Sequence, residues 1–324
     1  MTRAKGCVLQ LLAGPCVTIA ILLTMTAISA GGSSSGTSLP QRVFASPEDA
    51  KQALVEAAKA KDRAALRAIF GPVAQELEPG DPVEQANELD HFDRHVAEGV
   101  TLVKEGEAKA ILVIGSSKWP FPVPVVRKDG SWRYDTEAGR EEILNRRIGR
   151  NELSAIKVCR AYVEAQREYY AMPEPDGDQI PKYAQHMMSR PGHRNGLYWP
   201  TAPGEKESPL GPLVASAREE GYLKTRPAGE RGPRPFHGYY FRILKRQGPS
   251  AAGGAFRYVI NGNMVAGFAL VAYPARWGVS GVMTFVVNQR GRVYQKNLGP
   301  NTAQIARRMK AYNPDLTWKL VEEP

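Results

Sequence analysis

The spacing of apolar residues predicts that the folded part of the chain begins with helices. Ser46-Pro47-Glu48-Asp49 supplies an N-cap, a proline at the first helical position and two acids in the first turn. Apolar residues then recur at helical spacing around Leu54 and again over residues 65–70, where Gly71-Pro72 ends the pattern. A further helix is predicted over residues 83–98.

The pattern then becomes typical of strands. Predicted strands cover residues 101–104, 109–114, 122–127 and 131–134. Lys128-Asp129-Gly130 is typical of a tight hairpin turn between the last two of them. Residues 44–137 are therefore predicted to form an N-terminal α+β domain in which helices pack on a curved antiparallel sheet.

A long helix and a second group of strands are predicted for the rest of the chain. The helix starts near Glu137 and continues to Ala171, because Pro173 and Pro175 follow. Predicted strands cover residues 239–245, 256–261, 268–273, 282–288 and 293–297, and a last helix covers 302–312. Residues 138–324 are therefore predicted to form a C-terminal α+β domain, made of a long helix and an antiparallel meander sheet.

The segment between the long helix and these strands is unusually long for a connection. Residues 172–237 are rich in proline and glycine and contain only a short helical pattern, near residues 213–220. Aromatic residues such as Tyr183, Tyr198 and Trp199 supply apolar area that can pack. We therefore expect an ordered excursion from the second domain.

The N-terminus has the pattern of an export signal. Arg3 and Lys5 precede an uncharged, mostly apolar run that reaches the small residues near Ala30. Residues 1–30 are predicted to be a cleaved signal peptide, and residues 31–43 a flexible linker rich in glycine and serine. The alternative is an uncleaved membrane anchor, because the run is long enough to span. Either form predicts an exported protein, periplasmic or extracellular and possibly tethered to the membrane.

The cysteines and the net charge limit the kinds of chemistry and of partner that we expect for this chain. Two of the three cysteines lie in the export segment, so Cys159 is alone in the mature chain and is predicted to be buried at helical spacing with Ile156 and Val163. The chain has a net charge of +10. For an exported protein, this charge favours an envelope protein or an anionic cell-surface component as partner, and no nucleic acid is expected. The alternative is simply a solvated surface.

The sequence contains few patterns of catalytic chemistry. His91 and His95 would share one helix face, but Phe92 stands where a metalloprotease motif has its glutamate, so we favour a solvated polar face over a metal site. None of Ser189, Ser208 and Ser280 stands in a G-x-S-x-G motif, and nothing resembles a phosphate-binding glycine-rich loop ahead of a helix. The sequence therefore predicts no catalytic residue, no metal and no cofactor.

Five residues of the long segment form the candidate binding set. An arginine beside aromatic rings suits an anion or a glycan, because the guanidinium is a planar fork and the rings offer stacking area. The alternative is that these side chains attach the segment to the sheet. The candidates are His193, Arg194, Tyr198, Trp199 and His237.

Several motifs together resemble one known family. They are Trp119-Pro120-Phe121-Pro122, the run 147–152, Pro191-Gly192-His193-Arg194 with 196–200, and Tyr273-Pro274 with 278–285. This set is similar to the exported bacterial domain-of-unknown-function 2950 family over nearly all of the chain after the signal. The resemblance implies no established activity, substrate or catalytic residue.

A weaker resemblance covers residues 151–298 and is to pilin and pseudopilin head domains. It lies in Asn151-Glu152, in Gly238-Tyr239-Tyr240-Phe241 and in the segment 284–293. It implies a pilin-like long helix and sheet for the second domain. The chain lacks the Phe-Thr-Leu-Ile-Glu cleavage segment and the hydrophobic stem of true pilins.

We predict an exported envelope protein without catalytic activity that binds or assembles through its C-terminal sheet and long aromatic segment. Two alternatives stay open. One is an envelope hydrolase that uses histidines of the long segment or the pair His91 and His95, which would require these histidines to meet in one cleft with perturbed pKa values. The other is a small-ligand carrier with a cavity in the N-terminal domain, lined by residues such as Trp119, Phe121 and Trp132.

Overall fold

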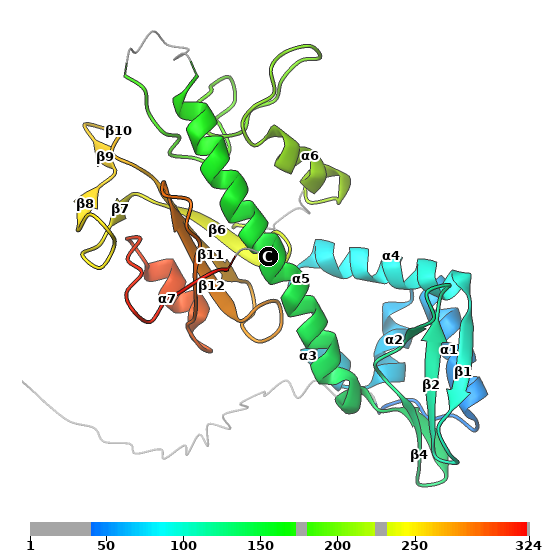
Figure 1. Ribbon diagram of the computed structural model, residues 1–324. Coiled ribbons are helices and arrows are strands. Elements are labelled where there is room, and N and C mark those ends of the chain that lie inside the picture. Colours follow the sequence, from blue (N-terminus) through cyan, green and yellow to red (C-terminus); the bar gives the residue numbers. More distant parts are fainter. Residues whose placement is uncertain (1–39, 173–179, 224–231, 323–324) are drawn as a thin grey trace, which may run out of the picture. The chain divides into compact units, whose positions relative to one another are not determined.

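The computed structural model describes residues 40–172, 180–223 and 232–322, which belong to one compact unit (Figure 1). The predicted signal peptide, residues 1–30, lies outside the described residues, as do residues 31–39 of the predicted linker. At the end of that linker, the Gln41 side chain donates hydrogen bonds to the carbonyl oxygens of Ile69 (3.0 Å) and Tyr134 (2.7 Å). Ordered structure therefore begins before Phe44.

Four helices open the described chain, and side chains cap three of them. Their bounds are Pro47–Lys59 (α1), Arg63–Phe70 (α2), Val73–Glu76 (α3) and Pro82–Glu98 (α4). Ser46, Asp62 and Asp81 each accept a hydrogen bond from a backbone N–H of the first turn. The predictions for α1, α2 and α4 are confirmed, and α3 is an additional short helix.

A five-stranded antiparallel sheet follows these helices. Its strands are Val100–Lys104 (β1), Lys109–Ile114 (β2), Trp119–Pro120 (β3), Val125–Lys128 (β4) and Ser131–Tyr134 (β5). They lie in the order β1-β2-β4-β5, and β3 pairs with β2. Asp129 and Gly130 both have positive φ and close the predicted hairpin. The strand predicted over 122–127 begins only at Val125, because Pro122 and Pro124 cannot donate to a ladder.

Helix α1 packs on this sheet to form the first hydrophobic cluster. Leu54, Leu112 and Tyr134 are almost completely buried in it. The hydroxyl of Tyr134 donates to the carbonyl of Ala50 at 3.1 Å, which satisfies the buried polar group.

One long helix, Thr136–Tyr170 (α5), links the two hydrophobic clusters. Ile143, near its start, packs on the first cluster, whereas Cys159 and Tyr162 are buried in the second. The predicted continuous helix is confirmed. The division into domains 44–137 and 138–324 stays a prediction, and it would fall in the first turn of α5.

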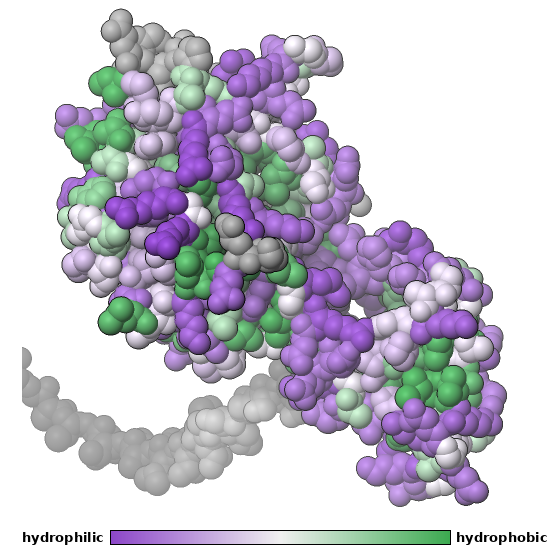
Figure 2. Space-filling view, in the orientation of Figure 1, coloured by the Kyte–Doolittle hydropathy of each residue, from purple (hydrophilic) through white to green (hydrophobic). Residues whose placement is uncertain are grey.

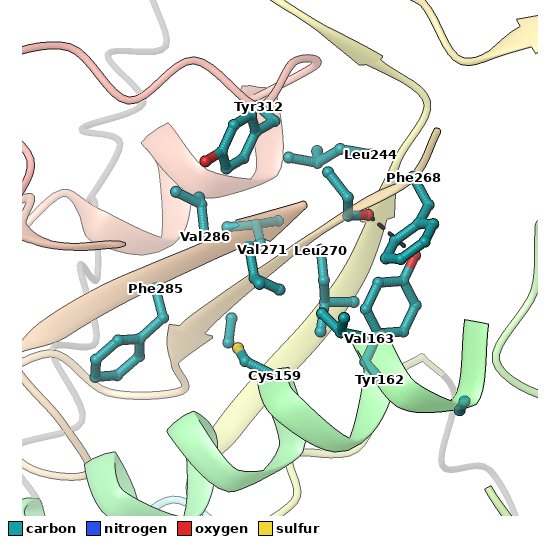
Figure 3. Close-up of a cluster of buried hydrophobic side chains, with 14 of the residues drawn as sticks. Cys159, Tyr162, Val163, Leu244, Phe268, Leu270, Val271, Phe285, Val286 and Tyr312 are labelled. Atoms are coloured by element: carbon teal, nitrogen blue, oxygen red, sulfur yellow. Dashed lines mark hydrogen bonds between the residues drawn. The ribbon is translucent and has the colours of Figure 1, made fainter. Parts of the chain in front are cut away.

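A second five-stranded antiparallel sheet packs against α5. Its strands are Tyr239–Leu244 (β6), Ala269–Pro274 (β11), Met283–Asn288 (β12), Tyr294–Asn297 (β13) and Lys319–Leu320 (β14), in the order β14-β13-β12-β11-β6. Helix α5 covers one face, and α7 (Thr302–Arg308) lies against the other (Figure 3). All six residues of β11 are therefore buried. The α+β fold class is confirmed.

The strand predicted over 256–261 is not part of this sheet. It divides into Phe256–Arg257 (β8), paired with Arg246–Gln247 (β7), and Val259–Ile260 (β9), paired with Asn263–Met264 (β10). Phe256 and Ile260 are exposed, and only Tyr258 between them is fully buried. The segment therefore lacks an apolar face long enough to compete for the edge of β6, which pairs directly with β11.

The long segment is ordered where the structure describes it, over residues 180–223 and 232–237. It contains one helix, Gly211–Glu219 (α6), close to the predicted patch. Figure 2 shows hydrophilic residues over much of the face in view, with hydrophobic residues gathered in patches between them. None of the described helices is both long and apolar enough to cross a membrane.

Burial of Cys159 leads to a direct chemical prediction. The thiol is fully buried, and burial raises its pKa to about 12. In a full chain with Cys7 and Cys16 changed to serine, we expect no reaction with a thiol-specific disulfide reagent at pH 8 in the native state. Complete reaction is expected in guanidinium chloride. Rapid reaction of the native protein would contradict the packing around α5.

Candidate functional site

The site is built around a buried carboxylate at the start of α4. Asp81 is 1% exposed, and one of its oxygens caps α4 by accepting from the backbone N–H groups of Val83 and Glu84. The other oxygen accepts from the N–H of Gly238 at 3.1 Å and from the hydroxyl of Tyr222 at 3.2 Å. These four donors offset the cost of burying the charge and join the start of α4 to Tyr222 and to Gly238.

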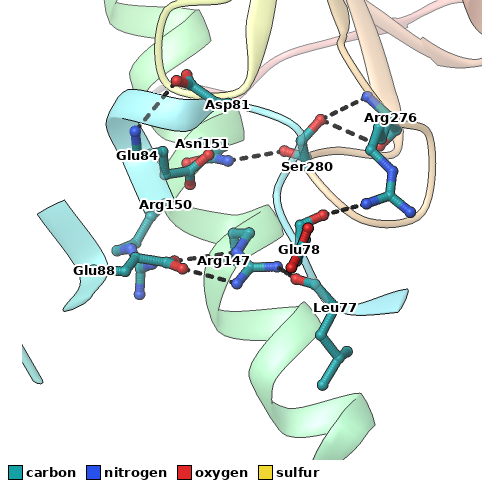
Figure 4. Close-up of polar contacts among 10 residues, drawn as sticks. All are labelled: Leu77, Glu78, Asp81, Glu84, Glu88, Arg147, Arg150, Asn151, Arg276 and Ser280. Atoms are coloured by element: carbon teal, nitrogen blue, oxygen red, sulfur yellow. Dashed lines mark hydrogen bonds and ion pairs between the residues drawn. The ribbon is translucent and has the colours of Figure 1, made fainter. Parts of the chain in front are cut away.

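Glu84 lies one turn further along α4 and has an unusual environment. Glu84 is 7% exposed, and its Oε2 atom has no hydrogen-bond partner among the described residues (Figure 4). The pKa of this carboxyl is raised to about 7, mainly by burial and also by the charge of Glu88, whereas Asn151 and Arg147 oppose the shift. Glu84 is therefore about half protonated near neutral pH.

Helix α5 contributes an amide to the same network. Asn151 donates to the carbonyl of Ser280 at 3.0 Å, and the hydroxyl of Ser280 donates to the carbonyl of Gly238 at 2.9 Å. Gly238 has φ +69, and a Cβ there would lie 2.6 Å from Asn151 Nδ2. Position 238 therefore requires glycine, both for its backbone conformation and for the close approach of Asn151.

Below this network, an arginine of α5 holds α4 in place. Arg147 is buried and forms a two-pronged ion pair with Glu88, with contacts of 3.1 and 2.8 Å. It also donates to the carbonyl of Leu77. Arg150 adds a second cation to Glu88 at 2.8 Å, so the carboxylate of Glu88 is shared by two guanidinium groups (Figure 4).

A cleft of about 1300 Å³ lies beside these contacts. Its walls come from α4, from α5, from residues 117–122, and from residues 213–222 and 236–237. The α5 wall carries Arg146, Arg150, Leu153 and Lys157, and Leu153 is 62% exposed. The guanidinium of Arg146 lies 5.3 Å from the ring centre of Trp119, which is in range of a cation–π contact.

His237 borders the cleft opposite α5. Its Nε2 atom lies 2.9 Å from Oε2 of Glu220, and the other oxygen of Glu220 accepts from the hydroxyl of Ser216 at 2.9 Å. Burial lowers the pKa of His237, and the charges of Glu220 and Asp81 oppose this shift. The residue has φ +46, which is uncommon outside glycine.

The histidines of α4 line the same cleft. Nδ1 of His91 lies 3.0 Å from the guanidinium of Arg94, and Nδ1 of His95 lies 3.8 Å from a carboxylate oxygen of Glu98. Among the residues that the structure describes, no group of three or more His, Cys, Asp or Glu side chains is placed to hold a metal ion.

The candidate binding residues of the sequence lie in two places. His237 lines the cleft, whereas His193, Arg194, Tyr198 and Trp199 do not. Trp199 is buried against Tyr169 of α5 with ring centres 6.4 Å apart, and Arg194 lies over its ring at 5.5 Å.

Tyr198 and His193 each form one further contact within the long segment. The hydroxyl of Tyr198 accepts from Arg218 of α6, and His193 is exposed, with its N–H bonded to the carbonyl of Arg190. Their contacts attach the long segment to α5 and α6. Whether these residues also bind a ligand stays a prediction.

Sequence reasoning missed Asp81, Glu84 and Asn151. The Asp81-Pro82 pair carries an N-cap signal that could have moved the start of α4 one residue earlier. Nothing local marks Glu84 or Asn151, because their partners lie far away in the sequence.

Comparison with known proteins identifies a family without an assigned activity. A family model described as "Protein of unknown function (DUF2950)" matches residues 41–321. No curated protein and no solved structure matches the chain. The resemblance to pilin heads therefore stays a prediction.

Glu84 leads to a prediction about the pH dependence of stability. Between its usual pKa of 4.5 and its folded value of about 7, the folded chain holds a proton that the unfolded chain has released. This contribution to the free energy of unfolding therefore falls as pH rises through that window. We expect Glu84→Gln to be about 3 kcal/mol more stable than the wild type at pH 8 and nearly equal at pH 4.5, by urea unfolding.

The exposed Glu107→Gln serves as the matched control and should show no such pH-dependent difference. A Glu84→Gln variant that loses the same stability at both pH values would contradict a protonated Glu84.

Arg147 leads to a second stability prediction. Arg147→Met removes a buried cation from Glu88 and a donor from Leu77, so we expect a loss of about 2–4 kcal/mol by urea unfolding. Arg146→Met, one residue earlier and exposed, should cost about 1 kcal/mol or less. Equal losses would show that the buried ion pair does not hold α4 against α5.

Proposed function

We propose that this chain, which belongs to the DUF2950 family of proteins of unknown function over residues 41–321, is an exported envelope protein that binds an anionic cell-surface polysaccharide in its cleft. One observation carries the proposal: a large cleft presents cations along a single face of α5. The family supplies no activity of its own. Export rests on the sequence pattern of the N-terminus.

The charges of the cleft favour an anion. Arg146, Arg150 and Lys157 stand four and seven residues apart, so they share one face of α5. Arg146 is paired with Glu142 and Arg150 with Glu88, so Lys157 is the cation of this face that an incoming anion meets without a carboxylate partner among the described residues. Lys157 is exposed and forms no ion pair with the described residues. On the opposite side, the acids are largely offset: Glu88 is paired with two arginines, Glu220 contacts His237, and Glu84 is half protonated near pH 7.

The apolar lining favours a ligand with rings over a simple ion. Trp119, Phe236 and the exposed Leu153 offer apolar contact area beside the cations. A carboxylated glycan combines both properties, because its rings have an apolar face and its acid groups lie at the edge. Its repeating charges would contact several α5 cations at once.

An envelope hydrolase is the second candidate, and one observation favours it. His91, His95 and His237 line one cleft, and burial lowers the pKa of His237. However, the hydroxyl of Ser216 donates to Glu220 instead of the imidazole, which does not activate it as a nucleophile. Binding is therefore the better-supported function.

Assembly through a pilin-like second domain is a narrower form of the binding proposal. It rests on the sequence resemblance and on exposed apolar side chains such as Phe256 and Ile260 at the small hairpins. Binding of a ligand in the cleft does not require this assembly.

Titration calorimetry with an oligogalacturonate tests the proposal on the full chain. We expect binding that weakens with added salt. Lys157→Glu should weaken it about tenfold, because the reversal places an anion in the cleft wall. Arg308→Glu on α7 makes the same charge change outside the cleft and should bind like the wild type.

Neutral dextran and polyphosphate are used as further ligands to distinguish a polysaccharide site from a general anion site. Neutral dextran should not bind. If polyphosphate binds at the α5 face and oligogalacturonate does not, the polysaccharide is the wrong class of anion. If neither binds, or if both variants weaken binding equally, the cleft is not an anion site.

A further inference from the structure

A second hollow lies among the helices of the N-terminal part. It measures about 250 Å³ and lies between α2, α3, α4 and the first half of α5. Its apolar lining includes Leu66, Phe70, Leu77, Leu89, Phe92 and Ile143. The carrier alternative placed a cavity at the sheet with Trp119, Phe121 and Trp132. Of these three, only Phe121 borders this pocket.

The pocket is large enough for an organic molecule. An apolar cavity of about 150 Å³ is known to take up benzene, so this hollow accommodates a somewhat larger apolar group. Leu66, Leu89 and Phe92 are only half-buried, although they border the first hydrophobic cluster or the pocket. A ligand would restore the dispersion contacts that these side chains lack.

Polar contacts fix the positions of the helices around the pocket. Arg147 joins α5 to Glu88 of α4 and to the carbonyl of Leu77 after α3. Arg67 of α2 forms an ion pair with Glu78. Because these contacts lie at the borders of the hollow, closing it would require the buried pair of Arg147 to break or move.

The border of the pocket also carries an available cation. Arg63 is exposed and lines the pocket, and its guanidinium donates only a long hydrogen bond of 3.3 Å to the side chain of Gln85. No carboxylate of the described residues pairs with it. By contrast, Arg67 and Arg147 already have carboxylate partners. A planar guanidinium suits a carboxylate, which it can bind through two parallel hydrogen bonds.

We infer that this pocket binds a small amphipathic carboxylate of the medium-chain fatty acid class. The apolar chain lies among Leu66, Leu89 and Phe92, and the carboxylate contacts Arg63. The pocket and the cleft adjoin, because Phe92 and Arg147 line both, whereas Arg63 and Leu89 border this pocket and not the cleft. The inference does not depend on the proposed function.

Titration calorimetry of the full chain with octanoate and with octanol tests the inference. We expect both to bind the wild type and octanoate to bind more tightly. Arg63→Gln should weaken octanoate about three- to tenfold, since one charge-assisted contact is lost, and should leave octanol unchanged. Arg127→Gln, an exposed arginine of β4 outside both hollows, is the matched control.

Leu89→Trp tests the location, because the larger ring should fill the pocket and abolish binding of both ligands. Circular dichroism shows whether Leu89→Trp folds. If Leu89→Trp does not fold, the effect of Arg63→Gln on octanoate binding tests the location instead. Lys157→Glu should leave octanoate binding unchanged. The inference is overturned if neither ligand binds the wild type, if octanol binds as tightly as octanoate, or if a folded Leu89→Trp still binds.

Discussion

The buried carboxylate of Asp81 is the contact on which the arrangement of the site depends. A charge out of water costs several kcal/mol unless hydrogen bonds compensate it, and Asp81 has four donors from three places in the chain. Two of them start α4, one is Tyr222, and one is Gly238 before β6. The start of α4 is thereby placed against the second sheet, and Arg147 places the middle of α4 against α5. Both hollows are bordered by helices that these two residues position.

Local sequence signals predicted the parts of the fold that depend on local physics. The caps at Ser46 and the Asp129-Gly130 turn depend on neighbouring residues only, and the structure has both. The prediction that the segment 256–261 is a strand of the second sheet was wrong, because β6 pairs directly with β11, whose six residues are all buried. Alternation of apolar and polar residues does not by itself show which of two strands will pair with a given neighbour.

The candidate site shows more clearly that local sequence signals do not predict contacts between distant parts of the chain. His237 was a candidate because it brackets the long segment, but its contacts with Glu220 and Tyr222 could not be predicted from the sequence. Glu84 looks like any acid in the first turn of a helix, where such residues are common. Its raised pKa arises from burial, to which distant parts of the chain contribute: Gly238, 154 residues away, lies close to its Oε2 atom. Trp199, conversely, was conspicuous, and its ring packs on α5.

The raised pKa of Glu84 also bears on how an anion could occupy a cleft that contains acids. An ionised Glu84 would repel such a ligand, whereas the protonated form would not. A bound anion would in turn raise the pKa of Glu84 further, because it adds a like charge near the carboxyl. Binding and proton uptake then favour each other, as linkage requires. If the cleft binds an anion as proposed, the burial that makes an ionised Glu84 unfavourable above neutral pH would make anion binding stronger below it.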